Sequence, residues 1–247
     1  MKREEWFGAV LALGVCFLVY GRLMQYGIIQ GILLAVVFAL VVGYFNPSLR
    51  KRAILFGLFF PTCGVIGGPL LVLVDALAGP RQDALLSRLD GGRSLLIFHW
   101  FLLHPFLWKL FDWVYDALSV FIAVAFLFGD WKPLLRTCIG STLGAFVLFA
   151  LCPAVGPALV SDPKAAPNCI PSMHVGIALL CMIFLHGKWR WAGLIFCILT
   201  AVSTISTGEH YIVDVVAAVP YILLVVAVDK ALSRRRAIVL QEQAQEA

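Results

Sequence analysis

The stretch from Pro167 to Asp214 decides the predicted fold, because it places two polar clusters at the ends of a long apolar segment. The first cluster is Pro171-Ser172-Met173-His174, and the second is Ser203-Thr204-Ile205-Ser206-Thr207-Gly208-Glu209-His210-Tyr211-Ile212-Val213-Asp214. About thirty mostly apolar residues separate them, which is enough for two hydrophobic helices. If the chain crosses a bilayer and returns, both clusters meet on one side. The stretch therefore predicts a polar site at a membrane face.

The composition places the chain among polytopic membrane proteins. Apolar residues make up 62% of the sequence, charged residues make up 13%, and the mean hydropathy is +0.95. A soluble domain of 247 residues could not cover so much apolar surface. The net charge of +5 is modest. The sequence has no basic stripe interleaved with aromatic residues of the kind that a nucleic-acid partner requires. We therefore expect the membrane, and not a nucleic acid, to be a partner, with a homo-oligomer left open.

Apolar runs predict an all-α membrane bundle of about eight transmembrane helices. The expected spans cover residues 5–21, 25–45, 53–76, 113–129, 136–153, 171–186, 190–206 and 211–231. The stretch 77–112 differs, because its first part is charged and rich in turn residues and its second part, Ser94 to Lys109, is rich in aromatic residues. That pattern predicts an interfacial or re-entrant helix.

The chain divides into three predicted parts. Residues 1–50 hold two N-terminal spans, residues 51–233 form a catalytic membrane core, and residues 234–247 form a cytoplasmic tail. The polar end of that tail, 241–246, is expected to be disordered or a frayed helix. No linker separates the parts, so one membrane domain accounts for the chain.

The distribution of lysine and arginine predicts the orientation in the membrane. With the Arg234-Arg235-Arg236 run in the cytoplasm, thirteen of the nineteen cations lie inside and six lie outside. The outer cations are Arg22, Arg81, Arg88, Arg93, Lys109 and Lys164. Both termini are then cytoplasmic, and the 154–170 and 207–210 loops, with the active site, lie at the periplasmic or lumenal face. We expect an integral membrane protein, of the bacterial inner membrane.

His210 and Asp214 stand four residues apart at the outer end of the last predicted span, which places both side chains on one helix face. The carboxylate can accept a hydrogen bond from one ring nitrogen, which leaves the other nitrogen basic and turned toward a substrate. A structural ion pair or a helix cap is the alternative. Because a carboxylate inside an apolar span is costly, we favour a catalytic role for both residues.

The cluster Pro171-Ser172-Met173-His174 begins the sixth predicted span. Proline suits the first turn of a helix, and the free backbone N–H groups of Ser172, Met173 and His174 are suited to hold an anion such as phosphate. Ser172 adds a hydroxyl donor, and His174 faces the same site. Taken alone, the cluster could equally be an interfacial helix start with a solvated histidine.

Most of the seven cysteines sit in apolar runs without metal-ligand spacing. We expect them to be small buried apolar residues and expect no metal site. Cys152 and Cys169 flank the loop before the first cluster, and a disulfide between them is left open.

Together the clusters resemble a known family. Pro-Ser-x-His, followed about thirty residues later by Ser-x-x-x-x-x-x-His-x-x-x-Asp, is similar to the type 2 phosphatidic acid phosphatase superfamily, whose fold is shared with vanadium haloperoxidases. Pro153-Ala154-Val155-Gly156-Pro157 and Thr207-Gly208-Glu209-His210-Tyr211 are similar to the branch with inositol phosphorylceramide and sphingomyelin synthases. The resemblance covers residues 110–231 and implies a six-helix core.

The resemblance implies a two-step mechanism through a covalent phosphohistidine. His210 would attack phosphorus while Asp214 orients it, and His174 would protonate the leaving oxygen and then activate the incoming water or alcohol. The family does this chemistry without a metal, so the resemblance implies no cofactor.

The basic residues of the family pattern are missing. That pattern has a Lys and an Arg-Pro pair before the first cluster, and an arginine after the first serine of the second, where this chain has Thr204. Lys164 and Arg93 are the outer cations that could take their place. The predicted substrate-binding group is Ser172, Lys164, Thr204, Gly208 and Arg93. Fewer fixed cations fit a phosphodiester or a lipid diphosphate better than a free phosphate dianion.

We expect a metal-independent membrane enzyme that hydrolyses a phosphomonoester or pyrophosphate of a lipid, such as phosphatidate or a polyprenyl diphosphate. The alternative enzyme is a phospholipid headgroup phosphotransferase, similar to inositol phosphorylceramide or sphingomyelin synthase, which Thr204 and the missing basic pair favour. A lipid scaffold or scramblase without catalysis is the third alternative, against which His174, His210 and Asp214 argue.

Overall fold

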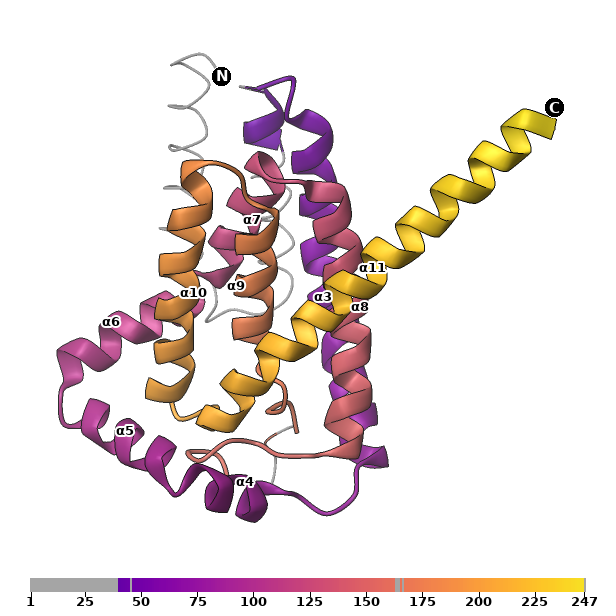
Figure 1. Ribbon diagram of the computed structural model, residues 1–247. Coiled ribbons are helices and arrows are strands. Elements are labelled where there is room, and N and C mark those ends of the chain that lie inside the picture. The colour runs from indigo at the N-terminus through magenta and orange to yellow at the C-terminus, as the bar shows by residue number, and fades with distance from the viewer. Residues whose placement is uncertain (1–39, 45, 163–164, 166, 247) are drawn as a thin grey trace.

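The computed structural model describes residues 40–246 apart from 45, 163–164 and 166, and for 60–65 and 246 it describes the backbone alone (Figure 1). Within these residues the chain forms helices and no strand, so the all-α prediction is confirmed. The first two predicted spans lie outside the described residues, apart from a helical stretch at 40–44. Lys164 lies outside them as well.

Nine helices follow one another in the described part of the chain. They are α3 (Arg50–Leu77), α4 (Asp83–Asp90), α5 (Arg93–Leu102), α6 (Pro105–Asp116), α7 (Leu118–Phe128), α8 (Trp131–Leu151), α9 (Met173–Phe184), α10 (Lys188–Ser206) and α11 (Ile212–Glu246).

α9 is the central helix of the bundle. It packs against α7, α8, α10 and α11. A helix that other helices surround is expected to be apolar on all faces. Apart from His174, the twelve residues of α9 are apolar or small. Leu180 of α9 is fully buried and packs in the main core with Phe126, Leu134 and Ile222 from three neighbouring helices. This packing fixes where the first turn of α9 lies.

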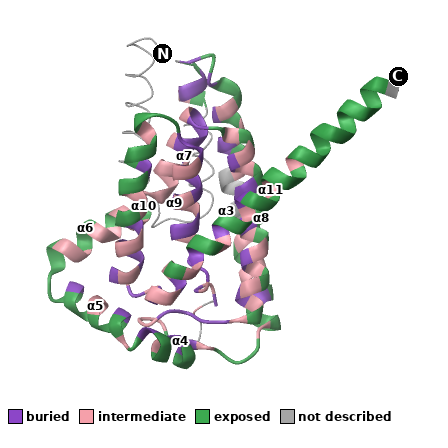
Figure 2. Ribbon diagram, viewed as in Figure 1, coloured by how far each residue is buried: buried purple, intermediate pink, exposed green. Residues whose placement is uncertain are grey.

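Four helices in the described part of the chain are long and apolar enough to cross a membrane. They are Pro105–Phe128, Trp131–Leu151, Lys188–Ser206 and Ile212–Gln245. Their outer faces are exposed (Figure 2), and large apolar side chains such as Trp191 and Leu224 lie there, as expected for helices in lipid. The helices indicate an integral membrane protein. The predicted count of eight spans stays a prediction.

The two ends of the bundle carry different connections. At one end, Arg52 donates to the carbonyl of Leu127, and the N–H of Asp130 donates to the carbonyl of Phe184. At the opposite end, α4, the described parts of the 152–172 loop and the turn between α10 and α11 gather together (Figure 1). The two polar clusters therefore lie at the same end, as the sequence predicts.

The stretch 77–112, predicted to hold an interfacial helix or a re-entrant element, forms more than one helix. It folds into α4, α5 and the first two thirds of α6, and α6 continues with α7 as one candidate span from Pro105 to Phe128. The span therefore begins before the predicted residue 113. Pro105 occupies the first turn of α6, where its missing N–H leaves no hydrogen bond unmade. The polar tail is also helical, since α11 runs to Glu246 through alanine, glutamine and glutamate, which are strong helix formers.

Candidate active site

Three helix ends bring the predicted catalytic residues together. His174 lies in the first turn of α9, Asp214 lies in the first turn of α11, and His210 lies in the turn that joins α10 to α11. The ring centroids of the two histidines are 6.2 Å apart. His210 is 2% exposed and Asp214 is fully buried, so the site is shielded from bulk water.

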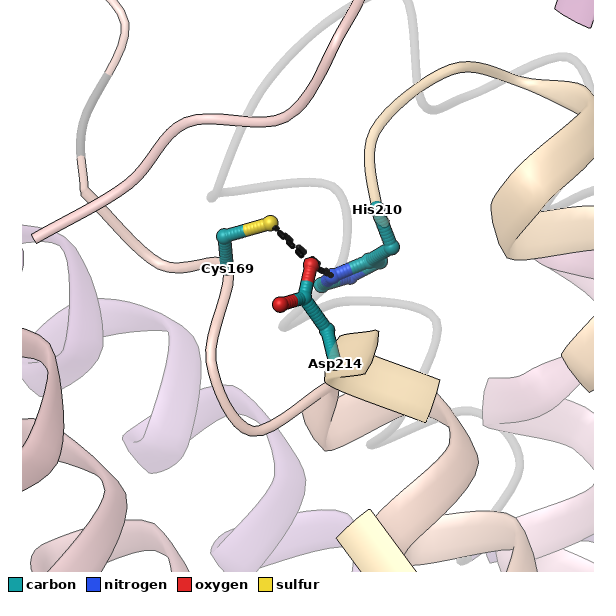
Figure 3. Close-up of side chains that lie close together, drawn as sticks. All are labelled: Cys169, His210 and Asp214. Carbon is teal, nitrogen blue, oxygen red and sulfur yellow. Dashed lines mark hydrogen bonds and ion pairs between the residues drawn. The ribbon is translucent and has the colours of Figure 1, made fainter. Parts of the chain in front are cut away.

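Asp214 turns one carboxylate oxygen toward His210 (Figure 3). Its Oδ2 lies 3.6 Å from Nδ1 of His210, which is an ion-pair distance and longer than the predicted hydrogen bond. The same oxygen accepts the backbone N–H of Tyr211 at 2.7 Å and the thiol of Cys169. Oδ1 of Asp214 is buried and has no hydrogen-bond partner among the described residues. The carboxylate is thus anchored from two sides and faces the imidazole.

Cys169 is a member of the site that the sequence analysis missed. Its Sγ lies 3.5 Å from Nδ1 of His210, beside the shared oxygen of Asp214. Burial, and after it the charge of Asp214, raises the pKa of the Cys169 thiol well above its ordinary value. The thiol therefore stays protonated and donates a hydrogen bond to the carboxylate of Asp214. Cys152 and Cys169 are both free, so the disulfide that the sequence left open is not formed.

Cys169, His210 and Asp214 also form a group that could hold a metal ion. All three are buried, and their ligand atoms lie within 4.8 Å of one another. The expectation of no metal site rested on spacing along the sequence. Cys169 lies 41 residues from His210 and 45 from Asp214, so only the fold brings its sulfur to the other two.

His174 has a different neighbour, the phenol of Tyr115 on α6. The two rings stack with centroids 3.9 Å apart, and the Tyr115 hydroxyl lies 3.1 Å from Nδ1 of His174. The same hydroxyl donates to Oε2 of Glu209 at 2.5 Å. Because its one proton goes to Glu209, the phenol oxygen is left to accept from Nδ1 of His174. Tyr115 and Glu209 were both missed, although Glu209 directly precedes His210 in the second cluster.

Asp83 fastens the loops around the site. Its Oδ1 accepts the N–H groups of Val155 and Gly156 at 3.1 and 3.3 Å and the hydroxyl of Tyr211 at 3.1 Å. Burial, and then Asp83, raises the pKa of the Tyr211 phenol, so the phenol keeps its proton and serves as donor. In a similar contact, the hydroxyl of Ser94 on α5 accepts the N–H at the start of α11 at 2.8 Å. Helices α4 and α5 thus hold the turn that carries His210.

Two glycines let the backbones of the site loops touch. Gly156 has φ +90°, and a Cβ there would lie 2.1 Å from the carbonyl oxygen of Glu209. Gly208 has φ +75°, and a Cβ there would lie 2.5 Å from Cβ of Ala158. The N–H of Ala158 donates to the carbonyl of Gly208 at 2.9 Å. Gly208 therefore shapes the turn before His210 through its backbone.

The buried hydroxyls near the site differ in what they bind. The hydroxyl of Ser172 is buried and has no hydrogen-bond partner among the described residues. Its backbone N–H donates to the carbonyl of Asp214 at 3.1 Å, so the prediction that this N–H is free for an anion is wrong. The starts of α9 and α11 lie side by side, which the sequence could not show. Thr204 donates its hydroxyl to the carbonyl of Ala201 within α10.

Of the two predicted cations, only Arg93 lies among the described residues. Arg93 is exposed at the first residue of α5, and Lys164 is outside the described residues. Arg81 donates to the carbonyls of Asp162 and Ala165 at 3.2 and 2.8 Å. It thereby fastens the loop that precedes the first polar cluster.

Comparison with known proteins adds one match. The sequence model of the PAP2 superfamily matches residues 87–228, from α4 into α11, a range that includes both histidines and Asp214. No curated protein and no solved structure gives a significant match.

Proposed function

The chain belongs to the PAP2 superfamily, whose members are generally phosphatases that act on phosphoesters, and from this premise we propose that it hydrolyses a lipid phosphoester in the membrane. One observation carries the proposal: two imidazoles converge at 6.2 Å at one end of a bundle of apolar helices, each with an acidic side chain on its Nδ1 side. Two such imidazoles suit a nucleophile and a proton donor on opposite sides of one phosphorus atom.

In the first step, Nε2 of His210 attacks phosphorus and the bond from phosphorus to the leaving oxygen breaks. His174 delivers a proton from its Nε2 to that oxygen, so the lipid leaves as an alcohol or as a phosphate ester. The positive charge that grows on the ring of His210 is stabilised by Asp214, 3.6 Å from Nδ1.

In the second step, the neutral His174 takes a proton from water while the water oxygen attacks the phosphohistidine. The N–P bond breaks, inorganic phosphate is released and both histidines return to their starting states. Tyr115 accepts from Nδ1 of His174 and so leaves Nε2 as the nitrogen that exchanges protons with substrate and water. Glu209 holds the phenol in that orientation through its short hydrogen bond.

Ser172 is the residue that we assign to a phosphoryl oxygen. Its buried hydroxyl has no other partner among the described residues, and buried hydroxyls normally have one. We assign Arg93 and Lys164 to the outer charges of the phosphate. Gly208 contributes through the shape of its turn. We take Thr204 as the feature that favours substrates of lower charge.

The apolar surroundings of the site support a lipid substrate. The candidate membrane spans enclose α9, and their outer faces are apolar. A phosphoryl group at the end of these helices allows an attached hydrocarbon chain to remain in the bilayer. Phosphatidate and polyprenyl diphosphates are the substrates that we propose. The concentration of cations on the other connections supports cytoplasmic termini and an outer site. The membrane that we propose is the bacterial inner membrane.

A headgroup phosphotransferase is the second candidate function. Thr204 stands where the phosphatase pattern has an arginine, and the loop at 153–157 resembles the branch of inositol phosphorylceramide synthases. In that reaction a lipid alcohol takes the place of water in the second step.

A transfer experiment separates the two functions. Purified wild type and the His210→Ala variant are incubated with phosphorus-labelled phosphatidate, polyprenyl diphosphate and phospholipid, with ceramide or diacylglycerol as acceptors. If the protein is a phosphatase, wild type releases the label as inorganic phosphate. If it is a headgroup phosphotransferase, the label moves onto the acceptor lipid. Equal turnover by wild type and His210→Ala would contradict both.

A further inference from the structure

We propose that Cys169, His210 and Asp214 form a binding site for a zinc-class divalent cation, and that occupation of this site inhibits the enzyme. The three residues offer one thiol sulfur, one imidazole nitrogen and one carboxylate oxygen, all buried and within 4.8 Å of one another. Sulfur, nitrogen and oxygen together are the ligand set of zinc and of its analogues cobalt(II) and cadmium.

Two of the three distances between the ligand atoms fit such an ion. A tetrahedral zinc ion with bonds of about 2.3 Å to sulfur and 2.0–2.2 Å to nitrogen and oxygen holds its ligand atoms roughly 3.3–3.6 Å apart. Sγ of Cys169 lies 3.5 Å from Nδ1 of His210, and that nitrogen lies 3.6 Å from Oδ2 of Asp214. The contact between Sγ and Oδ2 is a hydrogen bond, and it opens by about 1 Å when the ion replaces the thiol proton.

A second observation points to a ligand at this place. Oδ1 of Asp214 is buried and has no hydrogen-bond partner among the described residues, although Asp214 is fully buried. A buried carboxylate oxygen without a partner is costly, and a cation that binds both oxygens of Asp214 removes that cost. A water molecule can supply the fourth ligand.

The inhibitory consequence, unlike the binding itself, rests on the proposed function. Binding converts the thiol of Cys169 to a thiolate, whose proton leaves to water, and requires Nδ1 of His210 to be free of a proton. The neutral imidazole then carries its one proton on Nε2. That nitrogen must be bare to attack phosphorus, so the enzyme with bound metal cannot form the phosphohistidine. Catalysis needs no metal in this scheme.

Cobalt(II) and zinc titrations of the purified, tag-free protein test the site directly. Four proteins are compared: wild type, Cys169→Ser, the control Cys152→Ser and the catalytic variant His174→Ala. Cys152 is the matched control because it is a second free cysteine on the same loop and is not part of the cluster. The readouts are the thiolate-to-cobalt charge-transfer absorption, the zinc bound per chain after dialysis, and the release of phosphate.

The proposal expects one metal ion per chain and the charge-transfer band in wild type, Cys152→Ser and His174→Ala. Cys169→Ser loses the band, and its zinc affinity falls by at least about tenfold. Zinc inhibits wild type and Cys152→Ser, a chelator reverses the inhibition, and Cys169→Ser resists it. Equal zinc affinity in Cys169→Ser and Cys152→Ser would overturn the site. Because His174→Ala binds metal whether or not it turns over substrate, metal binding is tested independently of the proposed activity.

Discussion

His210 and His174 differ in how each reaches an acidic side chain. Nδ1 of His210 lies 3.6 Å from the carboxylate of Asp214, with the thiol of Cys169 bound to the same oxygen. Nδ1 of His174 lies 3.1 Å from the phenol of Tyr115, and only beyond that phenol lies the carboxylate of Glu209. One imidazole therefore faces a charge directly, and the other faces it through a neutral hydroxyl.

The difference matches the two roles that we propose. A nucleophile that becomes a cationic phosphohistidine gains from a full negative charge beside its ring. A residue that must give up a proton in one step and take one in the next is hindered by such a charge, which holds the proton in place. A phenol between His174 and Glu209 fixes the ring and transmits less of the charge. The comparison predicts which substitutions affect which step.

The largest effect is expected for His210→Ala, which removes the nucleophile. kcat should fall by about 10⁴-fold or more for every substrate, because no other group can form the covalent intermediate. Rapid acid-free quenching with labelled substrate should trap phosphohistidine in wild type and none in the variant. An unchanged thermal unfolding profile is the control that the variant is folded. Phosphohistidine in His210→Ala would assign the nucleophile to another residue.

His174→Ala comes next and separates the two histidines by leaving group. For a lipid alkyl phosphate kcat should fall by about 10²–10⁴-fold, because the alkoxide departs without a proton. For a lipid diphosphate or an aryl phosphate, whose leaving group is already stable as an anion, formation of the phosphoenzyme should fall much less. Burst kinetics with both substrate types measure this. An equal loss for both would mean that His174 does not act as the acid.

The sequence predicted that His174, His210 and Asp214 lie together, because short segments position them. His210 and Asp214 are one helical turn apart, and His174 joins them through two helices that cross and return. The all-helical class followed from the apolar runs, which are long and repeated.

The sequence could not predict the residues that contact the two histidines, which are Tyr115, Glu209 and Cys169. Tyr115 lies 59 residues from His174 and 94 from Glu209, and their contact depends on how α6 packs against α10. Cys169 was missed for the same reason, since the path of an irregular loop sets where its sulfur lies. The free N–H of Ser172 was predicted wrongly because a helix start seen alone does not reveal the carbonyl of Asp214 beside it.

Tyr115→Phe tests the role of the phenol between His174 and Glu209, and its expected effect is smaller than that of His174→Ala. It keeps the ring that stacks on His174 and removes the hydroxyl, so kcat should fall by about tenfold while KM changes little. Because the imidazole loses the acceptor that fixes its tautomer, the pH profile of kcat should shift, which a merely structural residue would not cause. Glu209→Gln, which keeps a hydrogen-bond acceptor, should lose less than Tyr115→Phe. If Tyr115→Phe leaves both kcat and the pH profile unchanged, the phenol does not position His174.

The smallest effect is expected for Tyr211→Phe, which removes one hydrogen bond from the loops that position His210 and none from those that position His174. The hydroxyl of Tyr211 is one of three donors to Oδ1 of Asp83, so its loss leaves Asp83 with two and costs about 1 kcal/mol of stability. The expected fall in Tm is then about 2–4 °C for a protein of this size, measured in detergent.

Tyr221→Phe is the matched control for this last comparison. Its hydroxyl donates to the carbonyl of Ser141 between α11 and α8, in the helical core and not among the site loops. Both variants should lose similar stability, but only Tyr211→Phe should slow phosphohistidine formation, by about threefold, because Tyr211 adjoins His210 and its N–H holds Asp214. If Tyr221→Phe slows that step equally, the effect reflects general loosening of the bundle. Asp83 would then serve the fold, and the position of His210 would depend on the contacts of Asp214 alone.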